Sequence, residues 1–396
     1  MSKQNIKRDR VMKFKTFQKS LFAAAVILLA SILLILGVSS AANLGAVKAD
    51  YAPTSAKAMC VMEAGSKRVL YSSNEKSTMP MASTTKIMTA ITAIENCSDL
   101  DKTFEISPKS VGISGTSIYL RKGEVMSTRD LLYGLMLVSG NDASVAIGEH
   151  VSGSCQKFVE LMNKTARKIG ANNSHFDNTH GLDSKTHFTS AYDLALITSY
   201  AMGNETFREI VSTKNIKLTN TDGKIRYLKN KNKLLNSLEG CCGVKTGFTN
   251  DAGRCLVSSC ERDGMTVVCV VLNCGPMFEE SAQLLEKAFN DYKLIDLTAG
   301  YAYNNLVKVI EGKRDNVRVS TLGKCLYPLK ANEMSKVRYE YEIKNELDAP
   351  VNINEEVGEI KIFIDNDLHF SEKVFTMESV RRSSVWAKVK EMIEQW

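Results

Sequence analysis

Ser83 and Lys86 have residue types and a spacing that suit nucleophilic catalysis. They lie in the stretch PMASTTKIMTA (80–90), where apolar residues at helical spacing predict a helix that carries both side chains on one face. A lysine amine with its ordinary pKa of about 10.4 is a poor base near neutral pH, but burial and nearby positive charge lower that pKa. The pair could therefore be a nucleophile and its general base. Taken alone the signal is weak, because a helix with an ordinary surface lysine also explains it.

Two further motifs carry polar side chains that could face a shared cleft. The first, S-G-N, runs from Ser139 to Asn141 in a predicted break between two helices, although a plain interhelical turn explains it as well. The second begins with Lys245 and Thr246 at the start of a strand-like run, where they could hold a substrate carboxylate. The next residue, Gly247, would let a substrate backbone approach closely. The alternative is a surface edge strand with a bulge glycine.

The order of the three motifs is much more specific than any one of them. S-x-x-K, S-x-N and K-T-G follow one another, with 53 positions from Lys86 to Ser139 and 104 from Asn141 to Lys245. This is the motif set of penicillin-recognising serine enzymes. The sequence resembles in particular the D-alanyl-D-alanine carboxypeptidases among the low-molecular-mass penicillin-binding proteins. Blocks such as DLLYGLMLVSGNDASVAI, FDNTHGLDSKTHFTSAYDLALI and GVKTGFTNDAGRCLVSS extend the resemblance over nearly all of the chain after residue 49.

The resemblance implies catalytic roles for four residues. Ser83 would attack the carbonyl between two D-alanines and form an acyl-enzyme, with Lys86 as its general base. Ser139 would relay a proton to the leaving amine, and Asn141 would position both the substrate amide and the lysine. Water would then release a peptide shortened by one D-alanine. The implied partners are peptidoglycan pentapeptides ending in D-Ala-D-Ala, with β-lactams as covalent inhibitors, and no cofactor or metal is implied.

The resemblance also implies substrate-binding roles for the strand 245–249. Lys245 would add positive charge to the cleft, lower the pKa of the base, and hold the terminal carboxylate together with Thr246 and Thr249. The backbone N–H groups of Phe248 and of the nucleophile would form an oxyanion hole, where each donor is often worth about 10²–10³ in rate. Some relatives add an arginine before the block ESAQLL, but here CGPMFEE (274–280) has no basic residue, which leaves more of the carboxylate binding to the lysine and the threonines.

Two other functions remain open from the sequence. A serine β-lactamase of the commonest class uses a glutamate in E-x-x-L-N to activate water, and the nearest match here, NKLLN (232–236), lacks the acid. A non-catalytic peptidoglycan-binding surface protein would tolerate the loss of Ser83, Lys86 or Lys245, all of which are present.

The elements around the motifs predict an α+β fold. A hairpin at 56–74 precedes a series of helices that ends at Gly203, and antiparallel strands with a turn at R-D-G follow before a closing helix at 278–295. Ser127 or Thr128 is expected to cap one of the helices and Asp142 the next. The resemblance makes 50–295 a penicillin-binding catalytic domain with the β-lactamase-like transpeptidase fold, an antiparallel sheet with helices and a helical subdomain. Alternating residues over 296–378 predict a small all-β sandwich domain.

The two ends of the chain predict export and contact with a membrane. Residues 1–49 contain eight Lys/Arg, one acid and an apolar run at 21–38, the layout of a signal peptide or an N-terminal membrane anchor. Cleavage after Ala49 or Ala42 is the favoured reading, and it places the rest at the outer face of the cytoplasmic membrane or in the cell-wall space. Residues 379–396 predict an amphipathic helix on a membrane surface, or one packed against the β domain.

Composition excludes some other classes. The net charge of +7 arises in residues 1–49, since the rest has 43 basic and 43 acidic residues, so nothing favours nucleic acid as a partner. The five histidines have no ligand spacing, which argues against a metal site. The ten cysteines form no C-x-x-C pair, and most are expected to be buried and reduced.

Overall fold

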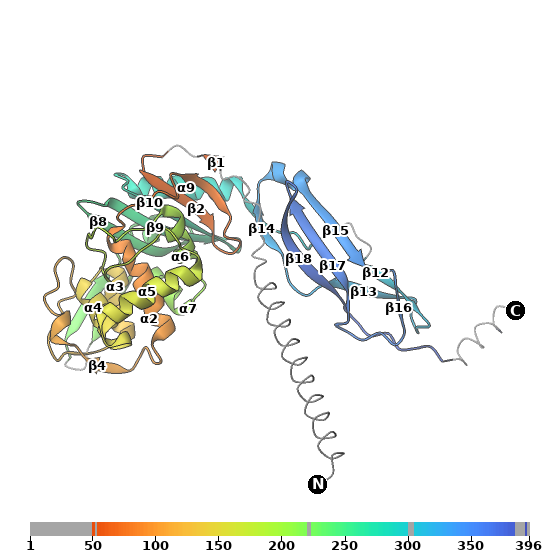
Figure 1. Ribbon diagram of the computed structural model, residues 1–396, viewed down its shortest axis with the longest axis horizontal. Helices are drawn as coiled ribbons and strands as arrows, with labels where there is room; N and C mark the ends of the chain where they lie inside the picture. Colours follow the sequence, from red (N-terminus) through yellow and green to blue (C-terminus); the bar gives the residue numbers. More distant parts are fainter. Residues whose placement is uncertain (1–49, 52–53, 220–222, 300–304, 385–392, 394–396) are drawn as a thin grey trace, which may run out of the picture.

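The computed structural model describes residues 50–51, 54–219, 223–299, 305–384 and 393. The predicted signal segment, 1–49, lies outside the described residues, as does most of the predicted C-terminal helix. Within the described ranges no helix has the length and apolar character needed to cross a bilayer. Figure 1 shows a mixed α and β part beside an all-β part.

The mixed part is built on one six-stranded sheet. Its strands lie in the order β1-β3-β2-β10-β9-β8, and every neighbouring pair is antiparallel except β1 with β3. The strands are β1 (Asp50–Tyr51), β2 (Ala58–Glu63), β3 (Val69–Ser73), β8 (Cys241–Thr249), β9 (Gly253–Arg262) and β10 (Met265–Leu272). Strands from both ends of this region share one sheet, and the helices lie between them in sequence, which confirms the predicted α+β class.

Helices cover both faces of this sheet (Figure 1). Along β2, Cys60 and Met62 pack into one core, while Met59 and Val61 pack into the other, so the strand is apolar at successive positions. The first core belongs to α2 (Lys86–Asn96), α3 (Thr128–Leu137), α4 (Asn141–Ser152), α5 (Cys155–Ile169), α6 (Ala191–Met202) and α7 (Glu205–Ser212). The second belongs to the short α8 (Leu234–Ser237) and to α9 (Met277–Asp291). Short pieces complete this part: β4 (Thr103–Glu105), β5 (Val125–Ser127), β6 (Asn215–Thr219), β7 (Ile225–Lys229), η1 (Ala82–Thr85) and η2 (Pro108–Ser110).

The predicted helix–break–helix segment forms, with one difference in capping. Ser127 caps α3 as expected, because its hydroxyl accepts a backbone N–H of the first turn at 3.1 Å. The prediction for α4 is wrong: this helix begins after Gly140, not after Asp142. The Asp142 carboxylate accepts the N–H groups of Ile118 and Leu120, each at 3.0 Å, and therefore fixes the loop before α3 onto α4.

The closing helix is shorter than predicted. α9 ends at Asp291, and the next residues form β11 (Lys293–Asp296), which pairs with β14 (Leu326–Leu329) from the all-β part. Pairing with a distant strand therefore overrides the local helical pattern at this point.

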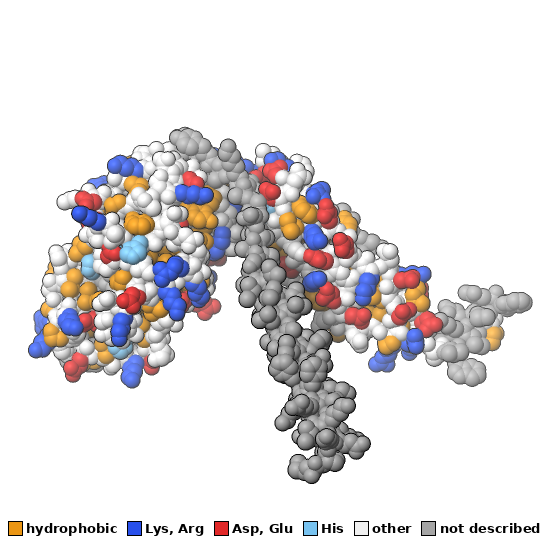
Figure 2. All heavy atoms as spheres, in the orientation of Figure 1, with side chains coloured by type: hydrophobic (Ala, Val, Ile, Leu, Met, Phe, Trp, Pro, Cys, Tyr) orange, Lys and Arg blue, Asp and Glu red, His pale blue; other side chains and the backbone are white. Residues whose placement is uncertain are grey.

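The all-β part contains a second six-stranded sheet, in the order β15-β17-β18-β13-β12-β16. Its core is formed by alternating apolar residues such as Val317, Ile360 and Ile362, which confirms an all-β C-terminal domain. The elements are β12 (Leu306–Ile310), β13 (Asn316–Thr321), η3 (Ala331–Lys336), β15 (Val337–Ile343), β16 (Glu346–Asp348), β17 (Glu356–Ile364) and β18 (Asp367–Thr376). On the face drawn in Figure 2, basic and acidic side chains are interspersed over both parts, without a single basic patch.

A buried arginine joins the two parts. The Arg68 guanidinium, whose side chain is 3% exposed, pairs with both carboxylate oxygens of Glu333 at 2.5 and 3.0 Å. It also lies between the rings of Tyr292 and Tyr327, at 5.1 and 5.2 Å from their centroids. Arg68 precedes β3 and Glu333 lies in η3, so a largely buried ion pair holds the all-β part against the main sheet.

We expect Glu333→Ala to lower the free energy of unfolding by about 3–5 kcal/mol, because it leaves Arg68 buried without its carboxylate. Urea titration followed by circular dichroism measures the change. Glu346→Ala is the matched control, since Glu346 and its partner Lys308 are each 63% exposed and 3.9 Å apart. It should alter stability by no more than about 1 kcal/mol. Equal effects of the two variants would contradict the assignment of Arg68 as a buried junction.

Candidate active site

Ser83 and Lys86 meet at the junction of η1 and α2. Ser83 is the second residue of η1, and Lys86 is the first residue of α2, so one helical turn separates them. The Lys86 Nζ donates to the Ser83 Oγ at 2.9 Å. α2 therefore begins directly after η1, and its first turn has no side-chain cap. This junction places the Lys86 amine next to the Ser83 hydroxyl.

Lys86 is fully buried and held by three acceptors. Besides Ser83, its Nζ contacts the Asn141 Oδ1 at 2.8 Å and the backbone oxygen of His180 at 2.5 Å. Burial, followed by the positive charges of Lys245 and Lys231, lowers its pKa well below the ordinary value. The lowered pKa and the absence of a carboxylate among these contacts therefore favour a role for Lys86 as a base.

The break between α3 and α4 carries the second motif into the same centre. Ser139 has a positive φ of 70°, which turns the chain sharply between the two helices. Its hydroxyl makes no hydrogen bond with the rest of the described chain. Asn141 opens α4, and its side-chain amide bridges Lys86 and the backbone oxygen of Ser114, 2.6 Å from Nδ2. The asparagine therefore connects the lysine with the loop that Asp142 also holds.

Lys245 and Gly247 lie on β8, at the edge of the main sheet. Lys245 is 1% exposed, and its Nζ donates to the Thr246 backbone oxygen at 2.9 Å. Burial and then the charge of Lys231 lower its pKa to about 7. A Cβ on Gly247 would lie 3.1 Å from the Ser83 nitrogen, closer than ordinary contacts. Glycine here thus lets β8 lie directly against the turn that holds the serine.

The remaining residues of β8 differ in their surroundings. Thr246 is half-buried, and Phe248 presents its ring to solvent with 63% exposed. The Thr249 hydroxyl is already engaged, because it donates to the Asp183 carboxylate at 2.8 Å and accepts the Ala252 N–H at 3.1 Å. Thr249 therefore fixes the end of the strand in this structure.

The segment 175–187 supports the centre from behind. His187 Nδ1 accepts the Asp177 N–H at 3.0 Å, so the hydrogen is on Nε2, which donates to Thr85 Oγ1 at 2.8 Å. Burial lowers the pKa of this imidazole to about 4, and it stays neutral. Gly181, with φ of 92°, passes so close to the Ala82 carbonyl that any side chain would overlap it. These contacts give His187 a structural role behind the centre.

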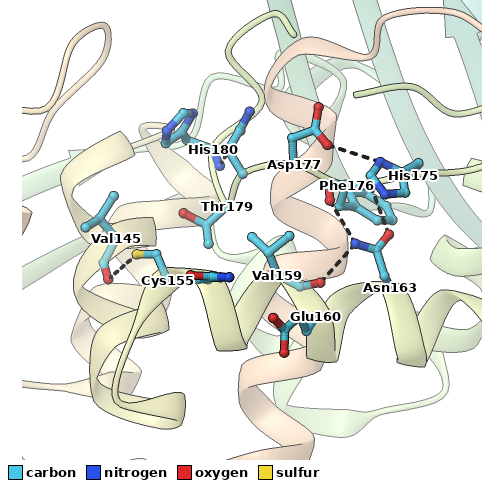
Figure 3. A pocket seen from close by; sticks show the side chains of 12 residues that line it. Val145, Cys155, Val159, Glu160, Asn163, His175, Phe176, Asp177, Thr179 and His180 are labelled. Carbon is cyan, nitrogen blue, oxygen red and sulfur yellow. Dashed lines mark hydrogen bonds and ion pairs between the residues drawn. The ribbon is translucent and has the colours of Figure 1, made fainter. Parts of the chain in front are cut away.

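A separate cavity of about 470 Å³ lies behind this segment (Figure 3). Figure 3 shows Asn163 reaching from α5 to the backbone of Phe176, which it binds through both amide atoms at 2.8 and 2.9 Å. Ser83 and Lys86 do not line this cavity, although His180, whose backbone oxygen binds Lys86, does. Asn163 thus fixes the backbone of Phe176, four residues before His180.

Sequence motifs gave no role to Lys231, yet it contributes to the electrostatics of the site. Its positive charge lowers the pKa of both Lys86 and Lys245. Its N–H binds the Leu137 oxygen at 3.1 Å, next to the S-G-N break, and the side chain of its neighbour Asn232 binds the Gly243 oxygen at 2.7 Å. A lysine between two asparagines (N-K-N) is the only sequence signal for it.

The arrangement contains the groups that nucleophilic catalysis by a serine requires. The Ser83 hydroxyl contacts a buried amine whose pKa is lowered, Lys245 and Lys231 add positive charge, and β8 lies against the turn that holds the serine. An antiparallel sheet, two helical layers and this serine–lysine centre define the penicillin-recognising class of serine enzymes. In the described ranges no cluster of His, Cys, Asp and Glu could bind a metal ion.

Comparison with known proteins gives the family. Residues 46–275 match the family model for D-alanyl-D-alanine carboxypeptidase, and residues 292–382 match that for the C-terminal domain of penicillin-binding protein 5. The chain belongs to the D-alanyl-D-alanine carboxypeptidase family.

Individual relatives agree over most of the chain. The D-alanyl-D-alanine carboxypeptidase DacF of Bacillus subtilis is 30% identical over 352 residues, which are 86% of this chain and 90% of that protein. DacD of Escherichia coli is 26% identical over 84% of this chain and 88% of its own length. The structure of penicillin-binding protein 5 from Haemophilus influenzae superposes with a TM-score of 0.66 and 26% identity, covering 85% of this chain and all of that one.

Proposed function

We propose that this protein is a serine-type D-Ala-D-Ala carboxypeptidase that shortens peptidoglycan stem peptides and is acylated by β-lactams. The observation that carries the proposal is the 2.9 Å contact between the Ser83 hydroxyl and the buried Lys86 amine, within a chain of this family. The substrate is a pentapeptide ending in D-Ala-D-Ala, and the product is the tetrapeptide with free D-alanine.

In the acylation step, Lys86 takes the Ser83 proton as the oxygen attacks the carbonyl between the two D-alanines. The lowered pKa of the lysine increases the share of neutral amine that can accept that proton. Ser139 passes a proton to the departing D-alanine amine, which its unengaged hydroxyl allows. Asn141, already bonded to Lys86 at 2.8 Å, orients both the lysine and the substrate amide.

The substrate is held along β8. The backbone N–H groups of Ser83 and Phe248 receive the developing oxyanion, and the close approach permitted by Gly247 supports this pairing. Lys245 attracts the terminal carboxylate, and Thr246 contributes its hydroxyl. Thr249 assists once its hydroxyl leaves Asp183, so its contribution depends on exchange of that bond.

The proposed enzyme should differ from a β-lactamase in how slowly it releases penicillin from the acyl-enzyme. The hydrogen-bond partners of Ser83 and Lys86 are an amide, a backbone oxygen and one another, and none is a carboxylate that could activate water. Asn232, at the position compared with the β-lactamase glutamate motif, binds backbone groups at both ends of its amide. Water therefore lacks a dedicated base when a β-lactam blocks the site.

The test is a paired assay on the purified protein. A peptide ending in D-Ala-D-Ala should yield free D-alanine, and a fluorescent penicillin should remain attached through denaturing electrophoresis. Penicillin labelling without D-alanine release would favour a peptidoglycan-binding role. Rapid turnover of penicillin would favour a β-lactamase.

Removal of the Lys231 charge should move the pH dependence of activity. At pH values below their own pKa values, Lys231 and Lys245 are both charged, and both charges favour deprotonation of Lys86. With Lys231→Met that help is lost, the pKa of Lys86 rises, and the acid limb of kcat/KM moves to higher pH. Lys233→Met is the control, because the Lys233 ammonium lies over the Phe278 ring, 5.5 Å from its centroid. An unchanged acid limb in Lys231→Met would refute this electrostatic role.

We further propose the domain limits and location that the sequence predicts. Residues 1–49 act as a signal peptide or anchor, 50–295 as the catalytic domain, 296–378 as the β-sandwich domain and 379–396 as an amphipathic helix. The protein then acts at the outer face of the cytoplasmic membrane, where its substrate lies, and it has no nucleic acid partner. Truncation after Arg382 tests the tail: membrane-bound protein should fall in cell fractionation, and an unchanged distribution would exclude the tail as the attachment.

A further inference from the structure

The cysteines of the main sheet are mostly separated by the sheet itself. All ten cysteines are free thiols in this structure. Cys60 and Cys255 face the core beneath α2–α7, whereas Cys269 faces α9 on the other side. Cys241 and Cys260 differ, because both lie on the α9 side. This pair therefore shares one face of the sheet.

The two residues are also directly opposite each other across β8 and β9. The Glu261 N–H donates to the Gly240 oxygen at 2.9 Å, while the Cys241 N–H turns away to the Leu238 oxygen at 3.2 Å. Cys241 and Cys260 thus occupy a non-hydrogen-bonded position beside the β-bulge at 241–243. Opposite Cα atoms at such positions of a regular ladder are about 4.5 Å apart. A disulfide spans Cα separations of about 4.4–6.8 Å.

The surroundings assign different roles to the two thiols. Cys260 is fully buried, while Cys241 is partly exposed. Interaction with Cys260 lowers the pKa of Cys241, against the opposing effect of burial, and interaction with Cys241 raises the pKa of Cys260. Cys241 is therefore the thiol that an external reagent meets first and the one that more readily forms a thiolate.

We propose that Cys241 and Cys260 are a thiol modification site that forms an intramolecular disulfide by exchange with a low-molecular-mass disulfide. The Cys241 thiolate attacks one sulfur of the reagent, which releases one thiolate and leaves a mixed disulfide. Cys260 then loses its proton and attacks the Cys241 sulfur, which releases the second thiolate. Two protein thiols are oxidised, and one disulfide is reduced to two thiols.

The bond would connect the first residue of β8 to β9, four positions before Lys245. It would enclose 18 residues, 242–259, and restrict the unfolded chain. We expect the oxidised protein to unfold at a higher temperature, by on the order of 5 °C. The proposal does not depend on the carboxypeptidase activity, and its readouts do not use it.

Oxidised glutathione serves as the probe, with the purified protein at neutral pH. The thiols that remain free are then blocked with N-ethylmaleimide. A non-reducing tryptic digest should contain peptide 234–245 linked to peptide 255–262, with a mass two hydrogens below the summed masses of the two separate peptides, each with its other cysteine blocked. Titration in denaturant should find two of the ten thiols missing. If all ten still titrate, or if glutathione stays attached to Cys241 without an internal bond, the proposal is wrong.

Variants identify the sulfurs, because each tryptic peptide contains two cysteines. Cys241→Ser should remove the linked peptides, and Cys260→Ser should stop the reaction at a glutathione adduct on Cys241. Cys242→Ser is the matched control, since Cys242 is adjacent in sequence but packs on the opposite face. The Cys242→Ser protein should still yield the linked peptides, and their absence from this variant would contradict the assignment of the disulfide to Cys241 and Cys260. Circular dichroism confirms that each variant is folded.

Discussion

Ser83→Ala is expected to abolish both penicillin labelling and D-alanine release. The substitution removes the hydroxyl that the Lys86 amine contacts at 2.9 Å, and no acyl-enzyme can form. Loss of a serine nucleophile from a comparable catalytic unit lowers kcat by about 10⁶-fold. Fluorescent penicillin on denaturing gels and a coupled D-alanine assay measure the two activities.

A neighbouring serine provides the control for this substitution. Ser77 is exposed and six positions before Ser83, so Ser77→Ala should retain both activities. Penicillin still bound covalently to folded Ser83→Ala would place the nucleophile elsewhere. D-alanine release that survives in that variant would show that another site performs the hydrolysis.

Lys86→Met is the second substitution with a large expected effect. Methionine fits the apolar part of this buried position but cannot accept the serine proton. Acylation by penicillin should slow by about 10²–10⁴-fold, the usual range for a general base. The wild-type protein should gain activity as pH rises through the lowered pKa of Lys86, and the variant should lack that dependence.

The measurement is the labelling rate against pH, by timed quench and fluorescence. Lys76→Met is the control, because Lys76 is exposed and lies outside the cleft. A variant that labels as fast as the wild type, with the same pH profile, would mean that Lys86 is not the base. Unfolding temperature, measured separately, shows whether each protein is folded.

Patterns within short stretches of the sequence were sufficient to predict most of the helices and strands and to name most of the candidate site residues. Three motifs in a fixed order identified the serine, the lysines and the asparagine, and periodicity placed them on a helix start, a break and a strand. It failed where a distant partner decided the local structure. Asp142 lies inside α4 and binds the loop at Ile118 instead of capping the helix from outside, and residues 293–296 pair with β14 instead of extending α9. Periodicity contains no information about such partners.

What the sequence by itself determined is the family and the candidate chemistry: a serine, a lysine three residues later, and the ordered motifs from which we propose this pair as nucleophile and base. What only the tertiary structure decided is the state of that chemistry. Lys86 has a lowered pKa because chain segments far apart in sequence exclude water from it and bring Lys245 and Lys231 near. Burial and the distances between charges depend on packing, and they exist only once the sheet and both helical layers have assembled.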